Sequence, residues 1–257
     1  MWARALRPFL MLARKSLAEF LGTALLLVAV VGSGIAAERL SPGDGGLQLL
    51  ENALATGAAL VAIIFAVGPV SGAHLNPVIT LADRAFGGVG NREAGAYIAA
   101  QLAGGTVGTV VANLMFSLPM VELSTKVRSS GGLWLGEVVA TLGLTLVVFG
   151  VVRSGRRTAA PFAVAAYVSG AVLFTSSTSF ANPAVTVART LSDSFTGIKP
   201  ASVTPFILAQ LLGGVLAVAV IRTLYPAMDQ AAGEVVMPRG DHVEDVEDVE
   251  DVEDVKA

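Results

Sequence analysis

Long apolar stretches alternate with short polar connections along most of this 257-residue chain. The apolar stretches cover residues 20–37, 49–67, 94–116, 133–152, 159–174 and 203–224, and charged residues gather between them. A helix of about 20 apolar residues is long enough to cross a bilayer core of about 30 Å. The pattern therefore predicts an all-α membrane protein with six transmembrane helices.

Two shorter segments between these spans share one pattern, a loop of small residues followed by Asn-Pro and a short apolar run. They contain Asn76-Pro77-Val78 and Asn182-Pro183-Ala184. Asn is a strong helix N-cap, and Pro is favoured at the first helical position. Ordinary caps of soluble helices would read the same way, but two copies between apolar spans favour paired re-entrant half-helices. Non-helical backbone at membrane depth is tolerated where protein buries it or where it lines a watery cavity.

The sequence is an internal duplication. The start of the first span, Ala18-Glu19-Phe20-Leu21-Gly22-Thr23, returns as Gly136-Glu137-Val138-Val139-Ala140-Thr141, and the Gln-x-x-Gly-Gly segment at Gln101 returns at Gln210. The repeats cover about residues 16–118 and 132–225. Since each repeat has three crossings, an odd number, the halves must be inverted relative to one another, which places a site near the midplane.

Composition and charge fit this picture. The chain is 54% hydrophobic and 14% charged, where a soluble domain has about a quarter charged residues. Residues 1–15 are basic, and Arg84, Arg92 and Arg153 follow other spans, so both termini are expected in the cytoplasm, with the chain in the cell's inner membrane. We interpret residues 20–37 as a span rather than a signal peptide, because the second repeat has a counterpart. Residues 226–257, with their Val-Glu-Asp copies, are expected to form a disordered acidic tail.

The two Asn-Pro segments, the paired glutamate segments and the Gln-x-x-Gly-Gly segments make residues 17–225 resemble the aquaporin, or major intrinsic protein, family. The resemblance implies a bundle of six transmembrane helices and two half-helices that meet at the bilayer centre, four identical subunits, and one pore in each. Asn76 and Asn182 would offer side-chain amides to a passing solute. A ladder of acceptor carbonyls would come from Gly72, Ala73, His74, Thr178, Ser179, Phe180 and Ala181.

The sequence departs from the family at the narrowest ring of the pore. The family usually has Arg after its second Asn-Pro-Ala, and this chain has Val185. By family spacing, the other ring positions fall on Thr56, Gly170 and Ser179. The ring should therefore be wide and without charge, leaving the half-helix dipoles and dehydration as a weaker barrier to cations. Arg189, one turn beyond Val185, is expected in the outer vestibule, with an ion pair to Asp193 as the alternative.

Several buried-looking polar residues have two interpretations. Glu19 and Glu137 could couple ions, but their paired positions favour accepting amide hydrogens from the re-entrant loops. Gln101 and Gln210 would support close packing and loop bonding. The ring of His74 is expected to be packed and hydrogen-bonded, so its functional contribution would be its backbone carbonyl.

The sequence thus predicts a passive channel for small neutral solutes, without cofactor or metal, and neither an enzyme nor a nucleic-acid-binding protein. The Asn-Pro-Ala-Val run resembles a bacterial aquaglyceroporin subgroup that passes arsenite as neutral arsenous acid. Neutral metalloid hydroxides and glycerol-like polyols rank first. An orthodox water channel is the alternative, and a coupled secondary transporter is the rival from another class.

Overall fold

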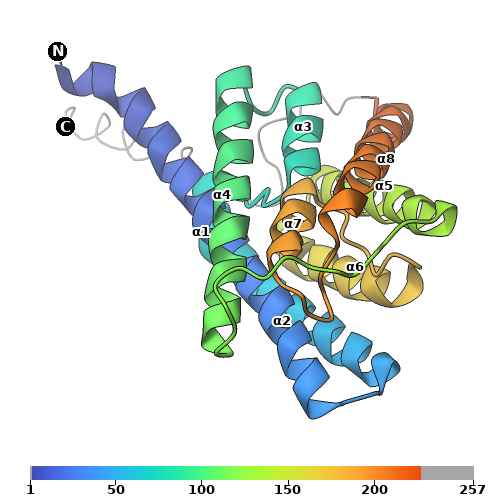
Figure 1. Cartoon of the computed structure of the whole chain (residues 1–257). Helices are drawn as coiled ribbons and strands as arrows, with labels where there is room; N and C mark the ends of the chain where they lie inside the picture. Colours follow the sequence, from blue (N-terminus) through green and yellow to red (C-terminus); the bar gives the residue numbers. More distant parts are fainter. Residues whose placement is uncertain (1, 227–257) are drawn as a thin grey trace, which may run out of the picture.

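The computed structural model describes residues 2–226 and shows a bundle of helices that surrounds two short ones (Figure 1). The acidic tail expected at the C-terminus lies outside the described residues. The longer helices are α1 (Trp2–Leu40), α2 (Gly45–Ser71), α4 (Asn91–Met115), α5 (Gly131–Arg153), α6 (Ala160–Phe174) and α8 (Val203–Leu224). The short helices are α3 (Pro77–Ala85) and α7 (Pro183–Ala188), and single 3₁₀ turns form η1 (Arg157–Ala159), η2 (Arg189–Leu191) and η3 (Pro200–Ser202).

The helix boundaries follow from local capping. Asp44 caps α2 by accepting a hydrogen bond from the amide of Leu47 at 2.9 Å, and Ser130 caps α5 in the same way. The second span was expected to end at Gly68-Pro69, but α2 continues through Pro69 to Ser71. It can do so because the next turn closes normally, with the amide of Gly72 donating to the carbonyl of Gly68 at 2.8 Å.

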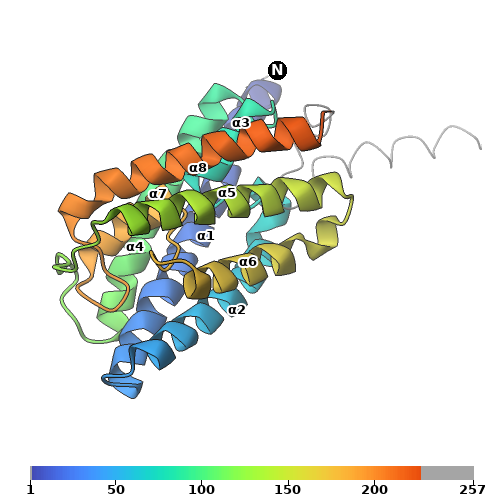
Figure 2. The ribbon, with the colours of Figure 1, turned by 90° about the vertical axis from the view of Figure 1, so that its right-hand side faces the viewer.

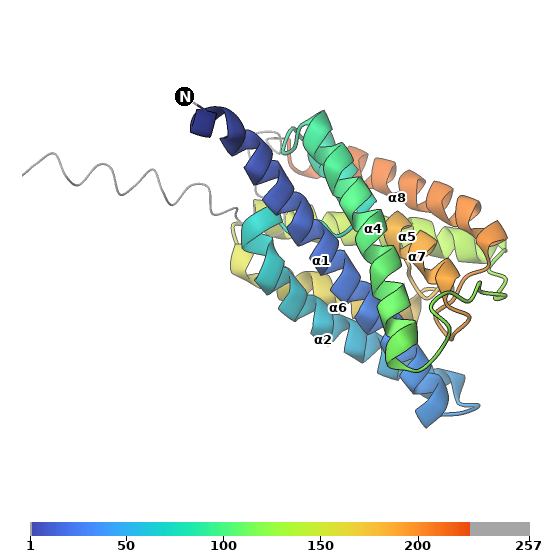
Figure 3. The same ribbon diagram turned by 60° about the vertical axis from the view of Figure 1, so that its left-hand side comes forward.

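The two halves of the chain repeat one packing scheme. In the first half α1 packs along α4 and α2, and in the second half α5 packs along α8 and α6. Figure 2 shows α8, α5, α6 and α2 side by side, and Figure 3 shows α1 crossing beside α4. The same order of partners in both halves is what an internal duplication predicts.

Glycines allow the closest of these crossings. A Cβ atom on Gly104 would lie 2.2 Å from the carbonyl oxygen of Phe20, so α1 and α4 meet at their backbones. Gly213 plays the same part between α8 and α5, where a Cβ atom would lie 2.6 Å from the carbonyl oxygen of Val138. Small residues at helix contacts are typical of membrane bundles.

The outer surface of the bundle is apolar, as expected for a protein embedded in lipid. In the part of the chain that the structure describes, five helices are long and apolar enough to cross a membrane, and α6 is shorter at 15 residues. Large apolar side chains such as Leu21, Leu25 and Val215 are exposed along α1 and α8. Buried polar side chains, in contrast, gather around α3 and α7. This inside-out distribution indicates an integral membrane protein whose functional site is internal.

Candidate functional site

Both Asn-Pro segments begin helices in the way that the sequence predicts. The side-chain oxygen of Asn76 accepts a hydrogen bond from the amide of Val78 at 2.9 Å, and α3 starts at the intervening proline. The side-chain oxygen of Asn182 accepts from the amide of Ala184 at 3.0 Å at the start of α7. Each asparagine therefore uses its oxygen as a cap and keeps its amide nitrogen for other partners.

Those amide nitrogens join the two halves of the chain. Asn76 Nδ2 donates to the carbonyl oxygen of Ala181 at 2.7 Å, and Asn182 Nδ2 donates to the carbonyl oxygen of Leu75 at 2.8 Å. The half-helices consequently meet with their N-terminal ends facing, and α3 lies above α7 in Figure 1. Each amide group has a second hydrogen, which is available to a solute.

The loops before the asparagines contain several non-glycine residues with positive φ, among them Thr178 at 61°. Ala73 and Leu75 have φ values of 50° and 50° in the first loop, and Ser179 and Ala181 have φ values of 43° and 49° in the second. Non-glycine residues in this left-handed region cost about 1–3 kcal/mol each and persist only where their surroundings hold them. The loops therefore need an external scaffold.

Two buried carboxylates provide that scaffold. Glu19 on α1 accepts hydrogen bonds from the amides of His74 at 2.9 Å and Leu75 at 2.7 Å. Glu137 on α5 accepts from the amides of Phe180 and Ala181, both at 2.9 Å. These are the contacts that a loop-supporting role requires, and they engage both oxygens of each carboxylate.

A glutamine continues each scaffold to the adjacent half-helix. Gln101 Nε2 donates to Glu19 at 2.7 Å and to the hydroxyl of Thr80 at 3.0 Å. Gln210 Nε2 donates to Glu137 at 2.6 Å and to the hydroxyl of Thr186 at 2.8 Å. The threonines were not singled out from the sequence, although they follow their asparagines at the same spacing in both repeats.

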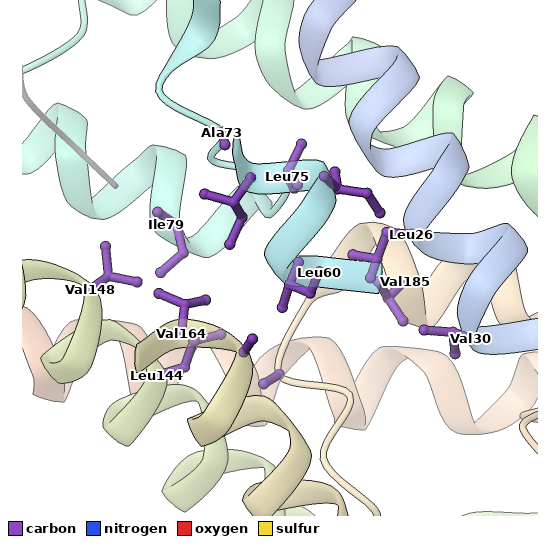
Figure 4. Close-up of a cluster of buried hydrophobic side chains, with 14 of the residues drawn as sticks. Leu26, Val30, Leu60, Ala73, Leu75, Ile79, Leu144, Val148, Val164 and Val185 are labelled. Carbon is purple, nitrogen blue, oxygen red and sulfur yellow. The ribbon is translucent and has the colours of Figure 1, made fainter. Parts of the chain in front are cut away.

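A cavity runs past the junction of the half-helices and encloses about 790 Å³ of empty space, open ends included. Both asparagines line it. One wall is apolar and comes from α1, α2, α5 and α6, with Leu60, Leu144 and Val164 in the cluster shown in Figure 4. Residues 73–75 and 178–181 of the two loops also line the cavity. The cavity lining thus combines apolar side chains with residues that can form hydrogen bonds.

Three of the four expected ring positions line this cavity. Thr56, Ser179 and Val185 do so, but Gly170 does not. A Cβ atom on Gly170 would instead contact the ring of Phe174 at 3.7 Å. The helix α6 lines the cavity through Val164, Val168 and Val172, whose spacing of four residues keeps them on one face. Gly170 and these three valines therefore lie on different faces of α6.

The first carbonyl ladder is also shifted from its expected position. Gly72 does not line the cavity, and Ala73, His74 and Leu75 do. Gly72 ends α2 in the left-handed conformation with φ 89° instead. This is the usual position of glycine after a helix.

Thr56, which lines the cavity, has an unusual hydroxyl. Its Oγ1 atom is buried and has no hydrogen-bond partner among the described residues. A buried polar group without a partner costs about 1–3 kcal/mol.

Arg189 is not in an exposed outer vestibule. It is 4% exposed, lines the same cavity as Val185, and its Cζ atom lies 3.4 Å from the centroid of the Phe180 ring. Its Nε donates to the carbonyl of Thr196. The alternative pairing with Asp193 is not present in residues 2–226, because that carboxylate accepts from the amide of Thr125 at 2.9 Å. The four ring positions themselves carry no charge, and the guanidinium of Arg189 lies beside Val185 in the same cavity.

A second buried arginine was missed by the sequence analysis. Arg128 belongs to the connection between α4 and α5, and its Nε donates to the carbonyl of Gly197 at 2.9 Å. Its Cζ atom lies 5.0 Å from the centroid of the Phe180 ring. Burial lowers the pKa of Arg128 to about 10, so its guanidinium remains charged at neutral pH. No periodic pattern marks this loop residue, and only the folded structure reveals its position.

The ring of His74 is packed and hydrogen-bonded, as the sequence suggested. Its Nδ1 lies 3.1 Å from the hydroxyl of Thr80, and its Nε2 lies 3.5 Å from a carboxylate oxygen of Asp83. Its ring also meets that of Tyr97 edge to face. Residues 2–226 contain no cluster of three or more side chains suited to hold a metal ion.

Comparisons with known proteins agree with this architecture. The sequence model of the major intrinsic protein family matches residues 8–179 and 158–250. The chain is 46% identical over 213 residues to an aquaglyceroporin, AqpS, of Rhizobium meliloti (strain 1021), covering 83% of this chain and 91% of that protein. It is 36% identical over 182 residues to aquaporin NIP1-3 of Oryza sativa subsp. japonica, covering 68% and 62%.

A solved structure has the same fold. The X-ray structure of the aquaglyceroporin from Plasmodium falciparum matches with a TM-score of 0.61 at 22% identity, covering 85% of this chain and 99% of that one. The six longer helices, the two facing half-helices, the paired asparagines and the family match lead to one conclusion. The chain belongs to the major intrinsic protein family, the family of aquaporin channels, and is a channel rather than an enzyme.

Proposed function

We propose that this channel passes small neutral hydroxylated solutes, with metalloid hydroxides such as arsenous acid and polyols such as glycerol ranked first. The observation that carries the proposal is the cavity lined by apolar side chains, by both re-entrant loops and by Asn76 and Asn182, and we assign the carbonyls of these loops as hydrogen-bond acceptors for the solute. The relative from Rhizobium meliloti, which is named an aquaglyceroporin, supports the solute class.

The lining suits a solute that has both hydroxyl groups and an apolar surface. Hydroxyl groups can donate to the carbonyl row and accept from the free amide hydrogens of Asn76 and Asn182, which replaces the hydrogen bonds lost with water. The carbon or metalloid side of the solute meets Leu60, Leu144 and Val164. An ion would lose its hydration shell without comparable compensation.

Val185 favours larger solutes over water alone. It occupies the position where the family usually has an arginine, and it lines the cavity with a short, uncharged side chain. An arginine there would add a long side chain and up to five hydrogen-bond donors. The shorter valine leaves room for a polyol, so we assign the solute preference to this position.

An orthodox water channel is the second candidate, and Arg189 is the observation that favours it. Its buried guanidinium narrows the same cavity and adds donors that suit water. The coupled transporter is disfavoured, because alternating access would require the halves to separate. Separation would break the reciprocal hydrogen bonds of Asn76 and Asn182, and a buried group left without its partner costs about 1–3 kcal/mol.

We also propose a cell inner-membrane location with both termini in the cytoplasm, and four copies per assembly. Lys15 pairs with Glu93 at 3.7 Å, and Arg222 donates to the carbonyl of Ala85 at 2.8 Å. The first half of α1 therefore lies beside the start of α4, and the end of α8 lies beside the end of α3. The segments around these contacts are rich in basic residues. Multi-angle light scattering of the purified protein tests the tetramer, and labelling of terminal tags in intact cells tests the orientation.

Stopped-flow light scattering on proteoliposomes tests the transport proposal. Water, glycerol and arsenous acid are compared side by side for the wild type and for Val185→Arg. We expect non-saturating glycerol and arsenous acid fluxes that need no ion gradient, and a strong loss of both in the variant with a smaller effect on water. Saturable, gradient-dependent flux would support a transporter instead. Wild-type flux of water alone would establish the second candidate.

A further inference from the structure

We infer that Arg189 supplies the cation barrier that position 185 lacks, and that Phe180 and Arg128 hold it in place. The inference rests on the proposed channel function and adds to it a division of labour. Val185 sets the width of the pathway, and a different residue, one helical turn further along, sets its charge selectivity.

The position of Arg189 suits this role. It follows Val185 by four residues, so the two side chains share a face of the chain at the end of α7. Both line the same cavity. Only the Nε of Arg189 has a hydrogen-bond acceptor among the described residues, the carbonyl of Thr196. Its two Nη groups remain available to the contents of the cavity.

Phe180 holds the guanidinium over its ring. The distance of 3.4 Å from Cζ to the ring centroid is well within the range of about 6 Å in which a ring attracts a cation. Phe180 is itself fixed, because its amide donates to Glu137 and its ring packs against Phe206 at 5.2 Å. A long side chain that would otherwise sample many rotamers is thereby kept at one place in the pathway.

Arg128 adds a second positive charge beside the same ring. Its guanidinium donates to the carbonyls of Gly197 at 2.9 Å, Ser177 at 3.3 Å and Phe195 at 3.3 Å. Glu137 is the carboxylate coupled electrostatically to both guanidiniums, and it is already hydrogen-bonded to the loop. Two guanidiniums therefore flank the ring of Phe180, while the carboxylate of Glu137 is engaged by the Phe180 amide.

This charge distribution discriminates against cations and not against neutral solutes. Two like charges about 6 Å apart repel strongly enough at an effective dielectric constant of about 20 to change a passage rate about 100-fold. A neutral polyol or metalloid hydroxide carries no charge for the guanidiniums to repel. The chain can therefore have a valine in its ring and still exclude protons and metal cations.

Proteoliposomes that report cation leak and glycerol flux separately test the inference. Proton leak is followed with an entrapped pH dye while valinomycin and potassium clamp the membrane potential, and glycerol flux is followed by light scattering. Arg189→Met removes the charge, and Arg189→Lys keeps it. Arg222→Met is the matched control at the opposite end of the bundle. Arg222 is exposed, and its Cζ atom lies 5.8 Å from the centroid of the Phe86 ring.

We expect Arg189→Met to raise proton leak at least about 10-fold and to increase glycerol flux, because a neutral, shorter side chain also widens the path. Arg189→Lys should stay within about twofold of the wild-type leak, and the control should match the wild type in both readouts. The inference would be overturned if Arg189→Met conducts glycerol and its proton leak is no higher than that of the wild type.

The two readouts keep this result separate from the proposed function. A wild-type protein that conducts water but no glycerol would overturn the solute proposal and leave the leak measurement to decide on Arg189. If Arg189→Met is not recovered as a monodisperse protein, Phe180→Leu decides, because it removes the ring and keeps both arginines. A raised leak in that variant supports the inference, and an unchanged leak refutes it.

Discussion

Replacing Glu137 by glutamine tests whether the buried carboxylates hold the conducting loops. The substitution keeps the shape of the side chain but turns one acceptor oxygen into a donor group. Three donors face this carboxylate, the amides of Phe180 and Ala181 at 2.9 Å and the Nε2 of Gln210 at 2.6 Å. A glutamine can accept through one oxygen only, so the donors on the other oxygen lose their acceptor.

The size of the effect follows from those contacts. Two of the three donors share the Oε2 atom of Glu137, and hydrogen bonds to charged groups contribute about 1.5–3 kcal/mol each. A glutamine whose oxygen takes the Oε2 position keeps these two bonds but makes them as weaker neutral ones, and it loses the bond from the Phe180 amide, which together cost about 3–5 kcal/mol. The neutral side chain no longer bears the desolvation cost of a buried charge, which offsets part of that loss. We therefore expect a destabilisation of about 3 kcal/mol, or a fall in Tm of about 6–12 °C for a chain of this size.

Thermal unfolding of the detergent-solubilised protein measures this fall, with the fluorescence of Trp134 at the start of α5 as the signal. Glu93→Gln is the matched control, because Glu93 is partly exposed and pairs with Lys15 near the end of the bundle, and such pairs contribute about 0–1 kcal/mol. Glu19→Gln should destabilise more than Glu137→Gln, because four donors face Glu19. Equal Tm values for Glu137→Gln and Glu93→Gln, with glycerol flux intact, would refute the reasoning.

Other consequences can be checked with the same preparations. Thr56→Val removes a buried hydroxyl without a partner, so the free energy of unfolding should hold or rise by up to about 1 kcal/mol, as the Tm would show. Gly104→Val would force a side chain against the carbonyl of Phe20 and lower the free energy of unfolding by about 1–3 kcal/mol or more. Gly95→Ala, with open space around the new methyl group, should raise Tm slightly. The recovery of each variant on size-exclusion chromatography and its Tm distinguish the two outcomes. Since burial lowers the pKa of Arg128 only to about 10, its charge is lost as pH rises through that value, so sodium leak should stay constant from about pH 6 to about pH 8 and increase only above about pH 10.

Much of the fold could be predicted because it depends on signals that lie in the sequence itself. Apolar spans, Asn-Pro caps and repeated motifs each specify local structure, and the duplication fixes how the halves relate. The interpretation of Glu19 and Glu137 as supports depended on their equivalent positions in two repeats. Inverted duplication places equivalent side chains behind equivalent loops, which is the arrangement that their hydrogen bonds show.

The details of the pathway wall could not be predicted by the same means. Whether Gly170 or Val172 lines the cavity depends on the rotation of α6, which is set by packing and by the length of the following loop. Arg128 lies in an irregular connection whose path is fixed by hydrogen bonds to residues about 70 positions away. Counting from Val185 showed that Arg189 shares its face, but only tertiary contacts determine that the guanidinium turns inward onto Phe180.

The hydrogen bonds between the half-helices also determine when this protein can become a channel during its synthesis. Asn76 and Ala181 are separated by 105 residues, and Leu75 and Asn182 by 107. The ribosome therefore completes the first re-entrant loop long before its acceptor and donor in the second exist. Contacts between such distant residues form slowly. The central junction is thus among the last parts to assemble, and a nascent chain that stalls before α7 leaves the first asparagine unpartnered within the bilayer.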